Sequence, residues 1–188
     1  MADDIIIFGC SPFINKIKSV IPKLQNKYDT IGINDFPVYY PNVKHWFVFD
    51  DGTYNTIKNN YKNQLIHAPN CLAERLKANG IENVEGFKPD SYYCEEMEDS
   101  LYFNTFSITC AIHWCIRKGY KNIYLAGVDI DDTHWQHFFD ERTHQMAEET
   151  LKDGIKAIYR LKQYINIYQL NPANKLNLLK TSIKELLQ

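Results

Sequence analysis

The stretch DDIIIFGCSPFINKI, residues 3 to 17, decides the fold class that the sequence predicts. Its first half, DIIIFG (4–9), is a short continuous apolar run, which is typical of a β-strand covered on both faces. The turn that follows has Pro12 where a first helical turn tolerates proline, and Ser11 is a candidate N-cap. Apolar residues then recur at helical spacing as far as Leu24. The stretch therefore predicts a buried strand, a tight turn and a helix.

Strands and helices alternate along the remainder of the chain. We expect further strands at residues 29–35, 45–51, 63–70, 81–88, 121–130 and 165–172. Helices are expected at residues 71–80, 105–120 and about 145–163, with one more at the C-terminus. This alternation predicts a single α/β domain over residues 1–188, with a mainly parallel, doubly wound, Rossmann-like sheet flanked by helices.

Two stretches between these elements are expected to be surface loops. Residues 89–104, PDSYYCEEMEDSLYFN, are acidic and aromatic without a clear period. They could form a lid, an acceptor-binding loop or a subunit interface in a homo-oligomer. Residues 129–144 are polar and rich in carboxylate and histidine side chains, and we interpret them as a polar loop beside the best-defined strand.

Composition excludes several classes of function. The 188 residues carry a formal net charge of −2, so there is no basic field for broad nucleic-acid binding. Five cysteines form no CxxC pair and no zinc-like spacing, which favours reduced thiols. The sequence has no signal-peptide pattern and no apolar stretch long enough for a membrane span. We therefore expect a soluble, cytoplasmic protein.

The predicted strand ends indicate where a ligand would bind. In a doubly wound sheet, ligands bind beyond the carboxyl ends of the strands, near the switch in strand order. The residues expected there are Gly9, Cys10, Ser11, Asn34, Asp35, Asp50, Asp51, Gly127, Asp129 and Asn171. The first turn could bind phosphate through backbone N–H groups, or its small residues could serve geometry alone. It lacks the glycines of GxGxxG and the GK[ST] of a P-loop.

Histidines are concentrated after the strand at 121–130. His134, His137 and His144 lie within eleven residues, in a segment that also holds Asp131. A histidine here could act as a general base, because its unperturbed pKa lies near neutrality. A carboxylate–histidine metal site is the competing interpretation, but the segment has no HxH or HExxH pair. We therefore predict no metal site.

Several segments together resemble the bacterial sialyltransferases of the Campylobacter lipooligosaccharide type. They are IIIFGCSPFINKI, GINDF, FNTFSITCAIHWCIRKGYKNIYLAGVDI and INIYQLNPANKLNLL. The same core is similar to that of the motility-accessory-factor glycosyltransferases and the 6-hydroxymethylpterin pyrophosphokinase-like proteins. The resemblance implies a nucleotide site formed by Gly9, Cys10, Ser11, Pro12, Asn34, Ser107, Gly127 and Asp129. It also implies a histidine base, for which His144 is the closest positional match, followed by His137 and His134.

The resemblance implies transfer of a sugar, sialic acid among the candidates, from a nucleotide such as CMP to a glycan or other hydroxyl acceptor. The nucleotide-sugar would be a co-substrate, with no further cofactor. The family's first turn is Gly-Asn-Gly-Pro-Ser, whereas this chain has Gly-Cys-Ser-Pro-Phe, so other nucleotide-sugars stay open. One alternative is Mg²⁺-dependent pyrophosphoryl transfer or phosphohydrolysis on a nucleotide, with the metal facing Asp35, Asp50, Asp51 and Asp129. Another is a nucleotide-binding module without catalysis.

Overall fold

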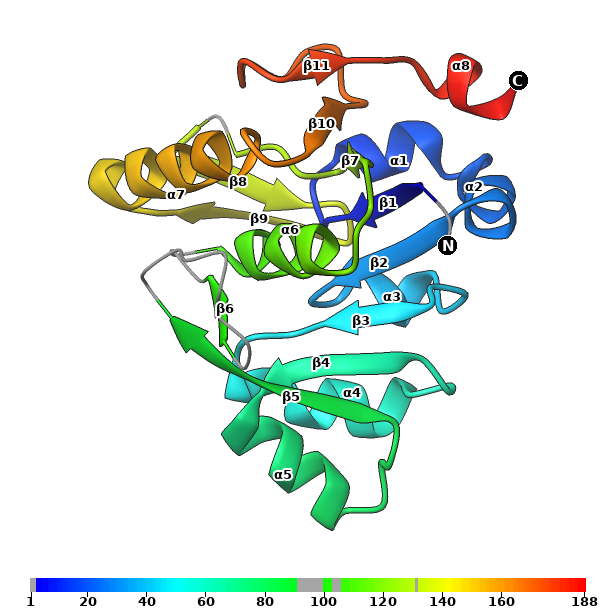
Figure 1. The fold of residues 1–188 in the computed structure, drawn as a ribbon, viewed down its shortest axis with the longest axis vertical. Coiled ribbons are helices and arrows are strands. Elements are labelled where there is room, and N and C mark those ends of the chain that lie inside the picture. Colours follow the sequence, from blue (N-terminus) through cyan, green and yellow to red (C-terminus); the bar gives the residue numbers. More distant parts are fainter. Residues whose placement is uncertain (1–2, 91–99, 103–105, 131) are drawn as a thin grey trace.

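A computed structural model describes residues 3–90, 100–102, 106–130 and 132–188. The described chain forms one α/β domain around a nine-stranded sheet in the order β11-β10-β7-β1-β2-β3-β4-β5-β6 (Figure 1). Every neighbouring pair of strands in this sheet is parallel. The predicted doubly wound parallel sheet is confirmed.

The strands and helices have the following bounds. The sheet comprises β1 (Asp4–Phe8), β2 (Asp29–Ile33), β3 (His45–Phe47), β4 (Leu65–Pro69), β5 (Val84–Asp90), β6 (Ser100–Tyr102), β7 (Asn122–Ala126), β10 (Asn166–Gln169) and β11 (Leu179–Lys180). The helices are α1 (Phe13–Ile17), α2 (Ile21–Lys27), α3 (Phe36–Tyr39), α4 (Tyr54–Asn60), α5 (Asn70–Ala78), α6 (Ser107–Arg117), α7 (Glu148–Leu161) and α8 (Ile183–Leu187). A short 3₁₀-helix, η1 (Asp51–Thr53), precedes α4.

The sheet is buried on both faces because alternate side chains of each strand point to opposite sides. In β1, Ile5 and Ile7 pack in the cluster formed with α6 and α7. Ile6 and Phe8 pack on the other face, against α1, α2 and Phe36. A third cluster joins β3 and β4 to α4 and α5. The apolar run in the first strand therefore forms the middle of a three-layer core.

The strand order switches direction at β1, which lies between β7 and β2. Two glycines allow the turns after β1 and β7 to approach each other closely. A Cβ atom on Gly9 would overlap the carbonyl oxygen of Gly127, and Gly127 itself has a positive φ of 69°. The N–H of Gly9 donates to the carbonyl of Ala126 at 2.8 Å. The residue that follows the first strand is therefore glycine because another backbone lies against it.

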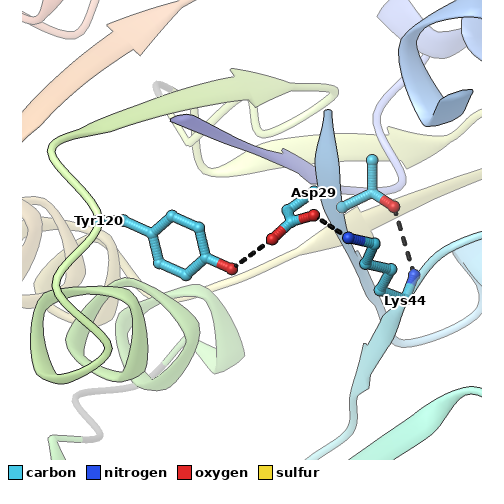
Figure 2. A network of polar contacts seen from close by, with 4 residues as sticks. Asp29, Lys44 and Tyr120 are labelled. Atoms are coloured by element: carbon cyan, nitrogen blue, oxygen red, sulfur yellow. Dashed lines mark hydrogen bonds and ion pairs between the residues drawn. The ribbon is translucent and has the colours of Figure 1, made fainter. Parts of the chain in front are cut away.

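The amino ends of the strands are held by a separate polar network. Asp29 at the start of β2 accepts hydrogen bonds from Lys44 Nζ and, at 2.8 Å, from the Tyr120 hydroxyl (Figure 2). Burial raises the pKa of Asp29, but the hydrogen bonds from Lys44 and Tyr120 bring it below its usual value. The network ties three chain segments together at the edge opposite the predicted site.

The segment expected to be a polar loop is instead a β-hairpin. β8 (His134–His137) pairs antiparallel with β9 (Asp140–Gln145), with an irregularity between Gln136 and His137. Figure 1 shows the hairpin on the same side of the molecule as the carboxyl ends of the central strands. The prediction of a loop at 129–144 is therefore wrong for residues 134–145, where antiparallel backbone pairing and stacking of Trp135 on His144 stabilise a hairpin.

The segment 89–104 also differs from a simple loop in its described part. β5 continues to Asp90, and β6 pairs with it in parallel from Ser100. Residues 91–99 and 103–105 lie outside the described residues, as do Met1, Ala2 and Asp131. None of the helices in the described part of the chain has the length and apolar character that a membrane crossing requires.

Candidate functional site

A cavity of about 400 Å³ opens at the carboxyl ends of the strands, beside the switch in strand order. We call it the inner pocket. The predicted site residues that line it are Gly9, Cys10, Ser11, Asn34, Asp50, Ser107, Gly127, Asp129 and His137. They come from the ends of β1, β2, β3 and β7, the start of α6, and the hairpin. The fold therefore gathers most of the predicted set around one cavity.

The backbone amides of the first turn donate hydrogen bonds mainly to the end of β7 and the turn that follows it. The N–H of Ser11 donates to Gly127 O at 2.9 Å, and the N–H of Phe13 donates to Ser11 Oγ at 3.3 Å. Gly9 N is likewise bonded to Ala126 O, and Pro12 has no N–H. Most amides that could hold a phosphate here are thus used within the protein. The turn shapes the wall of the pocket more than it supplies donors.

Asp129 connects the first turn to β10 and the segment that follows it. Its Oδ2 accepts a hydrogen bond from Ser11 Oγ, and its Oδ1 accepts from Asn174 Nδ2 at 3.2 Å and Gln169 Nε2 at 3.4 Å. Gln169 also donates to Val128 O at 2.9 Å, and both amide residues are buried. Three donors on separate segments therefore fix this carboxylate at the rim of the pocket.

Asn34 adopts an unusual backbone conformation after β2, with φ of 51°. Its N–H donates to Phe47 O at 2.9 Å, and its carbonyl accepts from Trp46 Nε1 at 2.7 Å. Asparagine tolerates this left-handed region better than most residues. Its side-chain Oδ1 is buried and has no hydrogen-bond partner among the described residues. Asn34 thus has an unused acceptor at a residue that lines the inner pocket.

Cys10 is not an activated nucleophile. Burial and, to a lesser extent, the nearby Asp35 carboxylate raise the pKa of the thiol to about 12. Its Sγ lies 3.5 Å from Ile33 O. Since the thiolate is the reactive form, covalent catalysis by Cys10 at neutral pH is disfavoured.

The three histidines of the hairpin have different surroundings, although the rings of His137 and His144 are in contact. His137 lines the inner pocket, whereas His144 stacks on Trp135 with ring centroids 4.4 Å apart. Nε2 of His144 is buried without a hydrogen-bond partner among the described residues. His134 lines a neighbouring cavity that Trp135 also lines.

The environment of His137 favours its neutral form. Partial burial lowers the pKa of His137, and the nearby His144 ring lowers it further, while Asp140 acts in the opposite direction. The centroids of the His137 and His144 rings are 4.8 Å apart. A neutral imidazole facing a pocket can accept a proton, which is the requirement for a general base.

The neighbouring cavity, which we call the outer pocket, has a volume of about 360 Å³. It is lined by Ser11, Pro12, Asp129, Asp132, His134, Trp135, Gln136 and Thr143. Four of these residues, Ser11, Asp129, Trp135 and Gln136, also line the inner pocket. The two cavities are therefore adjacent.

The charge of the inner pocket is unusual for a site that binds phosphates. Two carboxylates, Asp50 and Asp129, line it, but among its described lining residues there is no lysine or arginine. The first turn of α6 contributes Ser107 and Ile108, and the first turn of α7 contributes Thr150. Positive potential in the described lining therefore comes from helix starts rather than from side chains.

The comparisons with known proteins concern the fold. No protein-family model matches the sequence, and no curated protein is significantly similar to it. The structure of an MAf glycosyltransferase from Magnetospirillum magneticum AMB-1 aligns with 97% of this chain at 15% identity, with a TM-score of 0.72. This chain spans 34% of that protein. The expected likeness to the motility-accessory-factor group is thus confirmed for the fold.

Two structures of a mammalian sialyltransferase are more distant. One, in complex with Gal-beta-1-3GalNAc-ortho-nitrophenol, aligns with 89% of this chain and 69% of its own at 11% identity, with a TM-score of 0.43. The other aligns with 89% of this chain and 68% of its own at 10% identity, also with a TM-score of 0.43.

Some predicted residues do not line the inner pocket. Pro12 and His134 line the outer pocket, and His144 stacks on Trp135 without lining either pocket. Asp35 begins the turn into α3, where burial raises its pKa, and Asp51 begins η1. Asp131 lies outside the described residues. Among the described residues, no three histidine, cysteine, aspartate or glutamate side chains come together in a way that could hold a metal ion.

Sequence reasoning missed several residues that line the inner pocket. The main ones are Phe49, Phe106, Trp135, Gln136, Gln145, Met146 and Thr150. The alternation in His-Trp-Gln-His (134–137) could have indicated a strand with one face toward the site. The contribution of Phe106 and Thr150 had no comparable signal, since it depends on how α6 and α7 pack together.

Proposed function

We propose that the protein transfers a sugar from a nucleotide-activated donor to an acceptor hydroxyl. The observation that carries this proposal is the inner pocket, where strand ends, a helix start and His137 surround one cavity at the switch point. The shared fold with an MAf glycosyltransferase supports it. Location at a switch point alone would suit many ligands, so the chemistry of the lining residues is decisive.

The lining residues favour a donor with a single phosphate group. A diphosphate brings more negative charge, which proteins usually offset with arginine, lysine or a metal ion. Here the start of α6, with Ser107 in the pocket, is the best place for one phosphate. A CMP-activated sugar meets this requirement. Sialic acid is the sugar that the sequence resemblance suggests, and its carboxylate adds one further negative charge to such a donor. The unused Oδ1 of Asn34 would accept a hydrogen bond from the nucleoside.

Catalysis would proceed by direct displacement. His137 takes the proton of the acceptor hydroxyl, and the oxygen attacks the anomeric carbon of the sugar. The bond from that carbon to the phosphate oxygen breaks, and its electron pair leaves with the phosphate of the nucleotide. The start of α6 stabilises this charge through its N–H groups and dipole. His137 is the preferred base because it lines the pocket.

A thermal-shift screen against CMP, UDP, GDP and ATP, with and without Mg²⁺, tests the nucleotide site. We expect CMP to raise the melting temperature without metal, because a ligand at 100 times its Kd stabilises the native state by about 2.7 kcal/mol. Asn34→Ala should reduce this shift, whereas Asn79→Ala, on an exposed residue at the end of α5, should not. Turnover of the corresponding nucleotide-sugar is then measured by nucleotide release.

Other results would contradict the proposal in distinct ways. A shift that requires ATP and Mg²⁺ would favour pyrophosphoryl transfer or phosphohydrolysis. A shift with a nucleotide but without turnover of any nucleotide-sugar would indicate a binding module that lacks catalysis.

A further inference from the structure

The outer pocket has its own set of polar side chains, beyond those it shares with the inner pocket. Asp132, His134 and Thr143 line the outer pocket but not the inner pocket. They lie in the hairpin or directly before it, so the same element serves both cavities. His137, at the end of β8, lines only the inner pocket.

We propose that the outer pocket is the acceptor subsite and that it takes an uncharged, polyhydroxylated acceptor, namely a sugar. The proposal rests on the function proposed above, since it assumes that the donor occupies the inner pocket. It assigns the recognition of the acceptor to Asp132 and His134.

The outer pocket lies where an acceptor would have to bind. The two cavities share Trp135, Gln136 and the hydrogen-bonded pair Ser11–Asp129. A molecule in the outer pocket therefore needs to extend only past these residues to bring a hydroxyl to His137. Displacement requires the two reactants in adjacent sites, with the acceptor hydroxyl within reach of the base. The outer pocket satisfies this requirement.

The chemistry of the lining residues also suits a sugar. A sugar hydroxyl both donates and accepts hydrogen bonds, so it suits a site that mixes acceptors and donors. Asp132 supplies carboxylate oxygens, His134 an imidazole and Thr143 a hydroxyl. The Thr143 hydroxyl also accepts a hydrogen bond from Gln136 Nε2 at 3.1 Å. The ring of Trp135 adds an apolar surface for the C–H groups of a sugar.

Asp132 is already oriented for this role. Its Oδ1 accepts a hydrogen bond from the backbone N–H of His134 at 3.1 Å and lies 3.8 Å from Nδ1 of the same residue. The backbone hydrogen bond lowers the pKa of Asp132, with smaller effects from Lys175 and the His134 ring. The side chains of Asp132 and His134 are 59% and 57% exposed, so both can reach a ligand.

Charge decides between an uncharged and an anionic acceptor. Asp129 and Asp132 both line the outer pocket, and its described lining residues include no lysine or arginine. Lys175, which lowers the pKa of Asp132 through its charge, is not one of the residues that line the pocket. A phosphorylated or carboxylated acceptor would face two carboxylates without a cation in the lining, so a neutral sugar is favoured.

The test measures transfer from the donor found in the nucleotide screen to matched neutral and anionic acceptors. The neutral probes are galactose, lactose and Gal-β-1-3GalNAc, and the anionic probes are galactose 6-phosphate and galacturonic acid. We expect transfer to the neutral probes only. Asp132→Asn and His134→Ala should each lower kcat/KM for the acceptor about tenfold or more, mainly through KM, because each removes a hydrogen-bonding group. Asp153→Asn, on the exposed face of α7, is the matched control.

Two further measurements keep the outcomes distinct. The nucleotide-induced thermal shift of each variant shows whether the inner pocket is intact, and saturation-transfer NMR with lactose detects acceptor binding without turnover. The inference is overturned if anionic probes are preferred, or if both variants keep wild-type kcat/KM and lactose binding. It is also overturned if only a peptide or lipid hydroxyl is used. If wild-type protein binds nucleotide but turns over no donor, the proposed function fails first and this inference with it.

Discussion

His137 and His144 are neighbours whose rings are in contact, but their surroundings differ. His137 lines the inner pocket, whereas His144 packs on Trp135 with a buried Nε2. A base must reach the proton that it removes, so the pocket position matters more than position in the chain. The sequence resemblance favoured His144, and the geometry favours His137.

We expect His137→Gln to lower kcat about 100- to 10,000-fold, the usual contribution of a general base. The nucleotide-induced thermal shift should persist, because glutamine keeps much of the volume of the side chain. The wild-type rate should rise with pH through an inflection below the usual histidine value, because burial and His144 lower the pKa of His137. Steady-state rates across pH measure both effects.

His144→Gln is the paired variant for this experiment. It should reduce the melting temperature through lost stacking on Trp135 while retaining more activity than His137→Gln. The reverse order of activities would assign the base to His144 instead.

At the scale of elements, Gly154 shows how α7 controls the pocket. It lies in the middle of α7, where glycine is normally less favourable than alanine by about 1 kcal/mol. A Cβ at this position would overlap the ring of Phe106, which precedes α6 and lines the inner pocket. Gly154 thus lets two helices pack closely and determines where the Phe106 ring lies.

We expect Gly154→Ala to lower the free energy of unfolding by about 1–3 kcal/mol, as overpacking commonly does. The displaced ring should also weaken nucleotide binding. Urea unfolding and the thermal shift with nucleotide measure the two effects. Adding Phe106→Leu should recover part of the loss, and Lys156→Ala on the exposed side of α7 should change little. Stabilisation by Gly154→Ala with unchanged binding would show that the ring has room to move.

The hairpin is the element that sequence reasoning could not assign. Its strands contain few β-branched residues and its pairing spans only a few positions, so local preference is weak. Tertiary contacts stabilise it: Phe138 N donates to Cys10 O at 2.7 Å, and the Phe138 ring packs against Tyr39 and Phe36. An isolated hairpin is marginal in water, so these contacts determine its position over the pocket.

At the scale of the whole molecule, buried histidines make stability depend on pH. Burial lowers the pKa of His45 and His113 to about 4 each. His113 Nδ1 accepts a hydrogen bond from the N–H of Tyr102 at 2.8 Å, which requires this nitrogen to be unprotonated. His45 Nδ1 lies 3.1 Å from Nε2 of His67, whose other nitrogen faces Glu85.

The sign of the pH effect follows from these lowered values. Below about pH 6.5 the unfolded chain binds protons that the folded protein does not, so the free energy of unfolding falls as pH falls toward 4. Each histidine can contribute at most about 3 kcal/mol, and less for the partly exposed His45. We expect urea unfolding to show a clear loss between pH 7.5 and 5, and His45→Gln to make the loss smaller. Constant or rising stability over this interval would contradict the prediction.

The sequence by itself determined the parallel sheet, its buried strands and most of the residues at their carboxyl ends. This was possible because apolar runs and turn residues report burial and chain reversal locally, within a few positions. It did not determine which histidine faces the cavity, where Phe106 and Thr150 lie, or that two adjacent pockets share one hairpin. These features depend on side-chain packing between segments far apart in the chain. Only the tertiary structure could decide them. For example, a Cβ atom at position 154 would overlap the ring of Phe106, and no local sequence pattern indicates that these two residues meet.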